Sequence, residues 1–225
     1  MTPPLGRRLL MAGTTSFVLT IAAILALHAS SAVLAVAAVA ATTVLLAWFG
    51  RSASSTEHSG LAEVNAAWAL PLALVGRARF AEFLPTLVVQ LATALVAGFG
   101  ASALGARIGE PLLFAEPSWT HVALVTVLTG VLTAWAVLAV DGAGAEGLIA
   151  VPVVAAGSGT SIVLVIAANP AVTLGAAAAG LVPWAIAAGA AIALLAVTAA
   201  AAFAISLVAP EAADLSHSSD TTSTL

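Results

Sequence analysis

Cysteine, tyrosine and lysine are absent from this chain of 225 residues, and charged residues make up only 7% of it. Without cysteine there is no disulfide, no thiolate nucleophile and no Cys-ligated metal. An ordinary soluble domain carries about 25% charged residues, and a nucleic-acid-binding surface needs clustered basic charge. The chain has six arginines and a net charge of −4. Its composition excludes a soluble globular domain and gives no sign of a nucleic-acid partner.

Long apolar runs are what the chain has instead, with 62% hydrophobic residues and a mean hydropathy of +1.15. A helix needs about 20 apolar residues to cross a bilayer. Six runs are of about this length: Leu9–Leu27, Ala32–Phe49, Leu84–Leu104, Trp119–Val140, Gly147–Ala168 and Val182–Val208. Their many small residues permit close helix contacts in a membrane, and they lack the alternation of barrel strands. The sequence predicts an all-α integral membrane protein with six transmembrane helices in a lipid bilayer.

Two shorter apolar segments, Val64–Val75 and Asn169–Gly180, lie between the second and third runs and between the fifth and sixth. At about 12 residues neither segment can cross a bilayer, so we expect two re-entrant half-helices. The same order of spans and half-helix then occurs twice, at about residues 9–105 and 119–208. Because each copy has three spans, the second is inverted. The expected fold is an inverted repeat that forms one membrane domain, residues 1–208.

The arginines predict the orientation in the membrane. One side of the six-span arrangement carries five of the six: Arg7, Arg8, Arg51, Arg77 and Arg79. Cytoplasmic loops are enriched in positive charge, so both termini are expected in the cytoplasm and the protein in the plasma membrane. The polar residues 209–225 are typical of a disordered cytoplasmic tail. The pair Arg7-Arg8 before an apolar run also resembles a signal peptide, but that run is longer than the usual hydrophobic region of one.

The only two asparagines of the chain begin the two short segments. Asn65 is followed by Ala66 and Ala67, and Asn169 is followed by Pro170 and Ala171. Asn is a favoured N-cap and Pro suits the first helical position, so each asparagine predicts a helix start. Such a start is common and has no function by itself. Two helix N-termini meeting at mid-membrane, however, would offer N–H donors to a neutral solute and repel cations.

The segment Asn169–Gly175, NPAVTLG, resembles the NPA box of the major intrinsic proteins, the family of aquaporins and glycerol facilitators. The first half of the chain resembles a worn copy of the other box in His58-Ser59-Gly60, Asn65, Gly76-Arg77 and Gln90. The resemblance covers most of the chain. It implies a homotetramer with one pore in each subunit, which passes water or glycerol-like neutral solutes. The central donors of that pore would be Asn65 and Asn169.

The resemblance also implies a selectivity filter, made of Leu45, Gly157, Ile166 and Val172. Val172 stands where the family usually has an Arg, so this filter is apolar and lacks a fixed cation. The first box departs from the family as well, because it has Ala66 in place of Pro and is followed by Trp68 where a smaller residue is usual. Trp68 either intrudes on the pore or packs behind it, and packing is the commoner role of a Trp in an apolar interior.

The family commonly has a Glu in its first and fourth helices that holds the re-entrant loops, and this chain has none there. Four hydroxyl residues lie nearby: Thr14, Thr15, Thr126 and Thr129. They either replace the missing carboxylates or bond the backbone of their own helix. Glu63 either holds the first loop or faces the cytoplasmic vestibule. Glu57 and His58 are more typical of a solvated loop than of a gate.

The remaining polar residues do not indicate catalysis. No carboxylate pair, Ser-His-Asp set or metal-ligand cluster has the spacing of an active site, so we expect no enzyme and no cofactor. A passive channel for small neutral solutes is the first hypothesis. The alternative is a degenerate, non-conducting member with a structural or assembly role. A secondary transporter also uses inverted repeats and half-helices, but the spans carry no titratable group for coupling.

Overall fold

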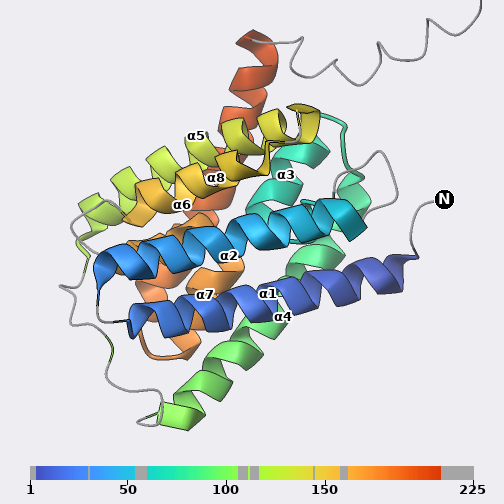
Figure 1. Cartoon of the computed structure of the whole chain (residues 1–225). Coiled ribbons are helices and arrows are strands. Elements are labelled where there is room, and N and C mark those ends of the chain that lie inside the picture. The colour runs from blue at the N-terminus through green and yellow to red at the C-terminus, as the bar shows by residue number, and fades with distance from the viewer. Residues whose placement is uncertain are drawn as a thin grey trace, which may run out of the picture.

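The computed structural model of the chain describes residues 4–29, 31–53, 60–105, 111, 117–143, 145–157 and 162–208. All regular elements in these ranges are helical (Figure 1), which confirms the prediction of an all-α protein. Five helices are long and apolar enough to cross a membrane: α1 (Leu5–Leu27), α2 (Ala32–Ala53), α4 (Phe80–Leu104), α5 (Trp119–Ala143) and α8 (Trp184–Val208). By length and composition, the fold is that of a multi-pass membrane protein.

The sixth expected span, Gly147–Ala168, differs from the prediction of one continuous helix. Its residues form three shorter elements, η2 (Glu146–Ile149), α6 (Ala150–Gly157) and η3 (Ile162–Ala168). Residues 158–161 lie outside the described ranges. Helix α6 ends at Gly157, and glycine is a poor helix former. Glycine alone does not end a helix here, because α4 continues through both Gly98 and Gly100. An apolar run of spanning length is therefore not enough to give one long helix.

Two short helices begin at the predicted asparagines. Helix α3 covers Ala66–Leu74 and helix α7 covers Pro170–Ala178, nine residues each. Most of their residues are buried inside the bundle, which explains why neither segment has a polar face. The prediction of two short apolar helices with Asn at the N-cap is confirmed.

Helix contacts repeat between the two halves of the chain. Helix α1 packs on α2, α4 and α7, and helix α5 packs on α6, α8 and α3. Likewise α4 contacts both short helices, and so does α8. Exchanging α1 with α5, α2 with α6, α3 with α7 and α4 with α8 therefore reproduces the same neighbours. The short helices also contact each other, and this contact brings their N-termini together.

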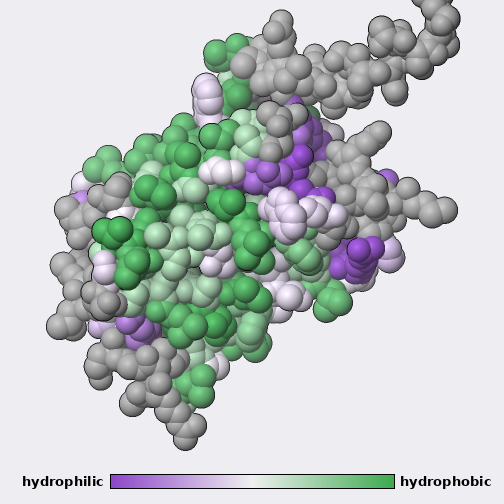
Figure 2. Space-filling model, in the orientation of Figure 1, coloured by the Kyte–Doolittle hydropathy of each residue, from purple (hydrophilic) through white to green (hydrophobic). Residues whose placement is uncertain are grey.

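The outside of the bundle is apolar along the lengths of the helices (Figure 2). Many large hydrophobic side chains are more than half exposed, among them Leu10, Leu34, Leu84, Trp135 and Phe203. Water would solvate such a surface poorly, whereas lipid solvates it well. On the face shown, hydrophilic residues gather toward the end where α1 begins. This distribution agrees with a bundle that is surrounded by lipid along its sides.

Candidate functional site

Asn65 and Asn169 are the N-cap residues of α3 and α7. The Asn65 Oδ1 atom accepts a hydrogen bond from the Ala67 N–H at 2.9 Å. The Asn169 Oδ1 atom accepts one from Ala171 at 2.9 Å and one from Val172 at 3.4 Å. Since each cap uses the side-chain oxygen, the orientation of both amides is determined, and each Nδ2 atom is directed away from its own helix.

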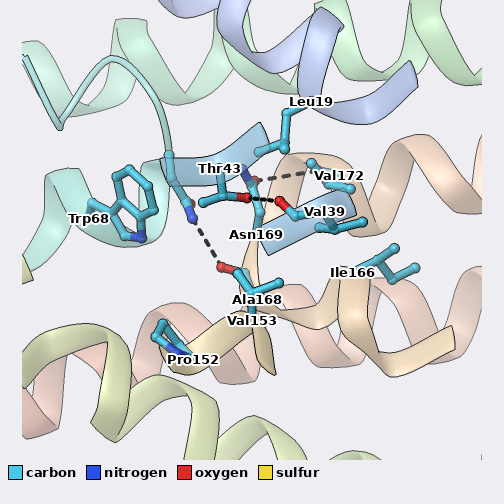
Figure 3. A pocket seen from close by; sticks show the side chains of 11 residues that line it. Leu19, Val39, Thr43, Trp68, Pro152, Val153, Ile166, Ala168, Asn169 and Val172 are labelled. Atoms are coloured by element: carbon cyan, nitrogen blue, oxygen red, sulfur yellow. Dashed lines mark hydrogen bonds between the residues drawn. The ribbon is translucent and has the colours of Figure 1, made fainter. Parts of the chain in front are cut away.

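The two caps meet in the interior of the bundle (Figure 3). The Nδ2 atom of Asn65 donates to the main-chain carbonyl of Ala168 at 3.0 Å, and Ala168 directly precedes Asn169. Both asparagines are buried, at 2% and 5% exposure. The Nδ2 atom of Asn169 has no hydrogen-bond partner in the part of the chain that the structure describes. Asn169 therefore holds a buried amide donor that no described residue uses.

Asn169 lines a narrow pocket with room for about one water molecule. Its polar lining comes from Asn65, Asn169 and Thr43, and the Thr43 hydroxyl donates to the Val39 carbonyl at 2.7 Å. The other lining residues are apolar apart from the main chain and the indole N–H of Trp68: Leu19, Val39, Trp68, Pro152, Val153, Ile166, Ala168 and Val172. The pocket is therefore a small apolar space with a few convergent polar atoms, which is the composition of a binding site for a small molecule.

Two of the four expected filter residues, Ile166 and Val172, line this pocket and are 3% and 2% exposed. Leu45 does not line it, because its side chain is 61% exposed on the outer side of α2. Residues two positions apart on a helix differ by about 200° in direction, so Thr43 faces the pocket and Leu45 faces away. Thr43, and not the expected Leu45, is therefore the residue of α2 that lines this pocket.

Gly157 is also absent from the pocket lining. It lies against Val36 of α2, where an added Cβ atom would collide with the valine side chain. Its position allows α6 and α2 to approach closely. The sequence carried one signal for the pocket residue of α2, since Thr42 and Thr43 are the only polar side chains in the run Ala32–Phe49.

The box residues after each asparagine are fully buried beside it. Ala66 and Ala67 begin α3, Pro170 and Ala171 begin α7, and their main chains form the first turns above the pocket. Trp68 follows in α3, lines the pocket and is 1% exposed. Trp68 also packs in an apolar core cluster, which was the commoner of the two roles considered for it.

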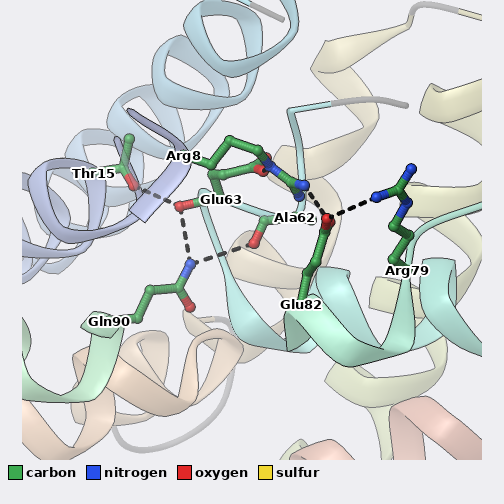
Figure 4. A network of polar contacts seen from close by, with 7 residues as sticks. All are labelled: Arg8, Thr15, Ala62, Glu63, Arg79, Glu82 and Gln90. Atoms are coloured by element: carbon green, nitrogen blue, oxygen red, sulfur yellow. Dashed lines mark hydrogen bonds and ion pairs between the residues drawn. The ribbon is translucent and has the colours of Figure 1, made fainter. Parts of the chain in front are cut away.

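The segment that leads into Asn65 is tied to α1 and α4 (Figure 4). The carbonyl of Glu63 accepts hydrogen bonds from the Thr15 hydroxyl at 2.8 Å and from the Gln90 amide at 2.9 Å. The Ser16 hydroxyl in turn donates to the Gln90 carbonyl at 2.8 Å. Thr15 therefore bonds the loop, which is the first of the two roles considered for these hydroxyl residues. Its hydroxyl also lies 2.9 Å from the Met11 carbonyl of its own helix.

The other three hydroxyl residues do not reach a loop. Thr14 and Thr129 bond carbonyls of their own helices, and the Thr126 hydroxyl has no partner among the described residues. The second loop is held instead by Thr173, whose hydroxyl lies 2.8 Å from the carbonyl of Ile166.

The Glu63 side chain is 5% exposed and accepts a hydrogen bond from the Arg8 Nε atom at 2.5 Å. Arg8 also pairs with Glu82 at the start of α4, and Glu82 pairs with Arg79 at 3.8 Å. This carboxylate therefore holds the loop to α1, which was the first of the two roles expected of Glu63. Glu57 and His58 lie outside the described residues, and so does the expected tail 209–225.

Within the described ranges, no three His, Asp or Glu side chains are grouped so that they could hold a metal ion. The polar groups of the residues that line the pocket are the asparagine amides, the Thr43 hydroxyl, the Trp68 indole N–H and the main chain. No protein family model matches the chain, and no curated protein matches it either.

Proposed function

We propose that the protein is a passive membrane channel for water or another small neutral solute, related to the major intrinsic proteins. One observation supports this most directly: Asn169, whose Nδ2 donor has no partner among the described residues, lines a water-sized pocket between the N-termini of α3 and α7. In this proposal α3 and α7 are the two re-entrant half-helices. Elements η2, α6 and η3 together form the sixth crossing, in an inverted repeat whose two halves share the same helix contacts.

The chemistry of the site suits a neutral solute with a hydrogen-bond acceptor. Each helix N-terminus carries a partial positive charge, and the two N-termini meet at the pocket. A solute oxygen is attracted to the Asn169 N–H, whereas a cation is repelled by both helix ends. Since Val172 is apolar, no fixed cation adds a second barrier. The channel would work by diffusion, as a homotetramer in the plasma membrane with both termini in the cytoplasm.

A second function, a non-conducting structural or assembly role, is favoured by the lining itself. Most of the pocket wall is apolar, including Trp68, Ile166 and Val172. An apolar constriction can lose its water and block conduction. A flux measurement separates the two functions, because only a channel speeds the volume change of a vesicle.

The test reconstitutes the full chain in liposomes and follows their shrinkage by stopped-flow light scattering under osmotic gradients of sucrose, urea and glycerol. We expect faster flux of at least one of water, urea or glycerol than in empty liposomes. Asn169→Asp should reduce it, because Asp keeps the N-cap but has no N–H to donate. The loss of one hydrogen bond, about 1.4 kcal/mol, corresponds to about tenfold in rate.

Leu45→Ala is the matched control. Leu45 is a filter residue by family resemblance but lies on the outer face of α2 in the structure, so its truncation should leave the flux unchanged. Thr43→Val, on the pocket face of the same helix, should change it. Flux equal to that of empty liposomes, from protein shown to be folded, would contradict the channel and favour the structural role.

A further inference from the structure

The third residue after each central asparagine lines the same pocket. On α7 this residue is Val172, and on α3 it is Trp68. Figure 3 shows them on the two sides of Asn169. The two helices thus have the same Asn cap, but the side chain that α3 places in the pocket wall (Trp) is much larger than the one from α7 (Val).

Trp68 is held firmly in this position. It is 1% exposed and is one of the largest fully buried side chains. It packs in one apolar cluster with Leu61, Val64 and Leu72. A close-packed interior gives a ring of this size little freedom to swing aside, so the indole is a permanent part of the pocket wall.

We propose that Trp68 sets the size limit of the pore and restricts the permeating solute to molecules of about the size of water. This inference rests on the proposed channel function and names the solute class for the same site. The pocket has room for about one water molecule. A three-carbon polyol such as glycerol is too large to pass while the indole is present. Replacing Trp68 by the valine that occupies the equivalent position on α7 opens the pocket on the α3 side.

The experiment compares the full-length protein with Trp68→Phe and Trp68→Val in liposomes, using water and glycerol as the probes. The unmodified protein should conduct water and exclude glycerol, with glycerol flux equal to that of empty liposomes. Trp68→Val should raise the glycerol flux by about tenfold, and Trp68→Phe should fall between the two. Leu72→Val is the control for loosened packing, because Leu72 lies on the same helix and in the same cluster but does not line the pocket.

The other outcomes separate this inference from the proposed function. Water flux in every protein with glycerol excluded by Trp68→Val would overturn the role of Trp68 and leave the channel intact. An equal gain of glycerol flux in Leu72→Val would overturn it too, because the cause would then be loosened packing. If only Trp68→Val conducts water, the limit lies below the size of water and the stated solute class is wrong. If no folded variant conducts anything, the channel function itself fails.

Discussion

The side-chain amide nitrogen of Asn65 donates a hydrogen bond to the main-chain carbonyl oxygen of Ala168 across 3.0 Å. Asn65 thus caps α3 through its Oδ1 atom. Through its Nδ2 atom it also holds Ala168, the residue directly before the N-cap of α7. Asn169 caps α7 but makes no bond to α3, since its Nδ2 atom has no partner among the described residues. The two asparagines are equivalent in the sequence but different in the structure, and this difference can be measured.

Asn65→Ala should therefore destabilise the protein more than Asn169→Ala does. The loss of an N-cap costs about 1 kcal/mol, and the hydrogen bond to Ala168 contributes about 1 kcal/mol more. We expect a decrease of about 2 kcal/mol in the free energy of unfolding for Asn65→Ala and about 1 kcal/mol for Asn169→Ala. Denaturant titration in detergent micelles measures both. Equal losses would show that the bond to Ala168 contributes nothing.

Gly98→Ala should destabilise the contact between α4 and α7. A Cβ atom at Gly98 would collide with the main-chain oxygen of Gly175 and stand 2.8 Å from the Ala178 Cβ atom. Because backbone cannot move aside as a flexible side chain can, we expect a loss of about 3 kcal/mol. The thermal unfolding midpoint in detergent should fall accordingly.

Gly100→Ala is the control for this substitution. Gly100 lies two residues further along α4, and an added Cβ atom would meet nothing within 4 Å. Ala is a better helix former than Gly by about 1 kcal/mol, so the midpoint should stay the same or rise. If the two variants behave alike, the close approach of the helices at Gly98 does not matter for stability.

Arg8→Gln should destabilise the loop before Asn65, because it leaves the buried carboxylate of Glu63 without its cation. Removing one partner of a buried ion pair costs about 3 kcal/mol. Restoring charge balance with Glu63→Gln in the same chain should recover part of that loss. Arg79→Gln is the exposed control: its side chain is 70% exposed and lies 3.8 Å from Glu82, so it should cost less than about 1 kcal/mol. A loss no greater in Arg8→Gln than in Arg79→Gln would contradict the role of Arg8.

The positions of the helices follow from local physical chemistry and were predictable. A run of about 20 apolar residues can satisfy its backbone in lipid only by forming a helix, and five such runs did. The short helices begin at Asn65 and Asn169 because an Asn side chain satisfies the free N–H groups of a first turn. Both effects involve residues only a few positions apart.

The composition of the pocket was not predictable in the same way. Helix α2 is apolar almost all round, so no hydrophobic stripe indicates which side faces inward, and Leu45 was chosen by resemblance where Thr43 is the residue that lines the pocket. The division of Gly147–Ala168 into η2, α6 and η3 was not predictable from its apolar composition either, because the run is as long as those that form single helices.

The sequence by itself thus determined the class of the protein, its long apolar helices and its two asparagine caps. Only the tertiary structure decided that Asn65 bonds the carbonyl of Ala168, that the Asn169 amide donor has no partner among the described residues, and that Trp68 lines the pocket. The bond from Asn65 to Ala168 joins residues 103 positions apart. Contacts of that range depend on how whole helices pack against one another, and in a chain built from small apolar residues many packings satisfy the local rules equally well.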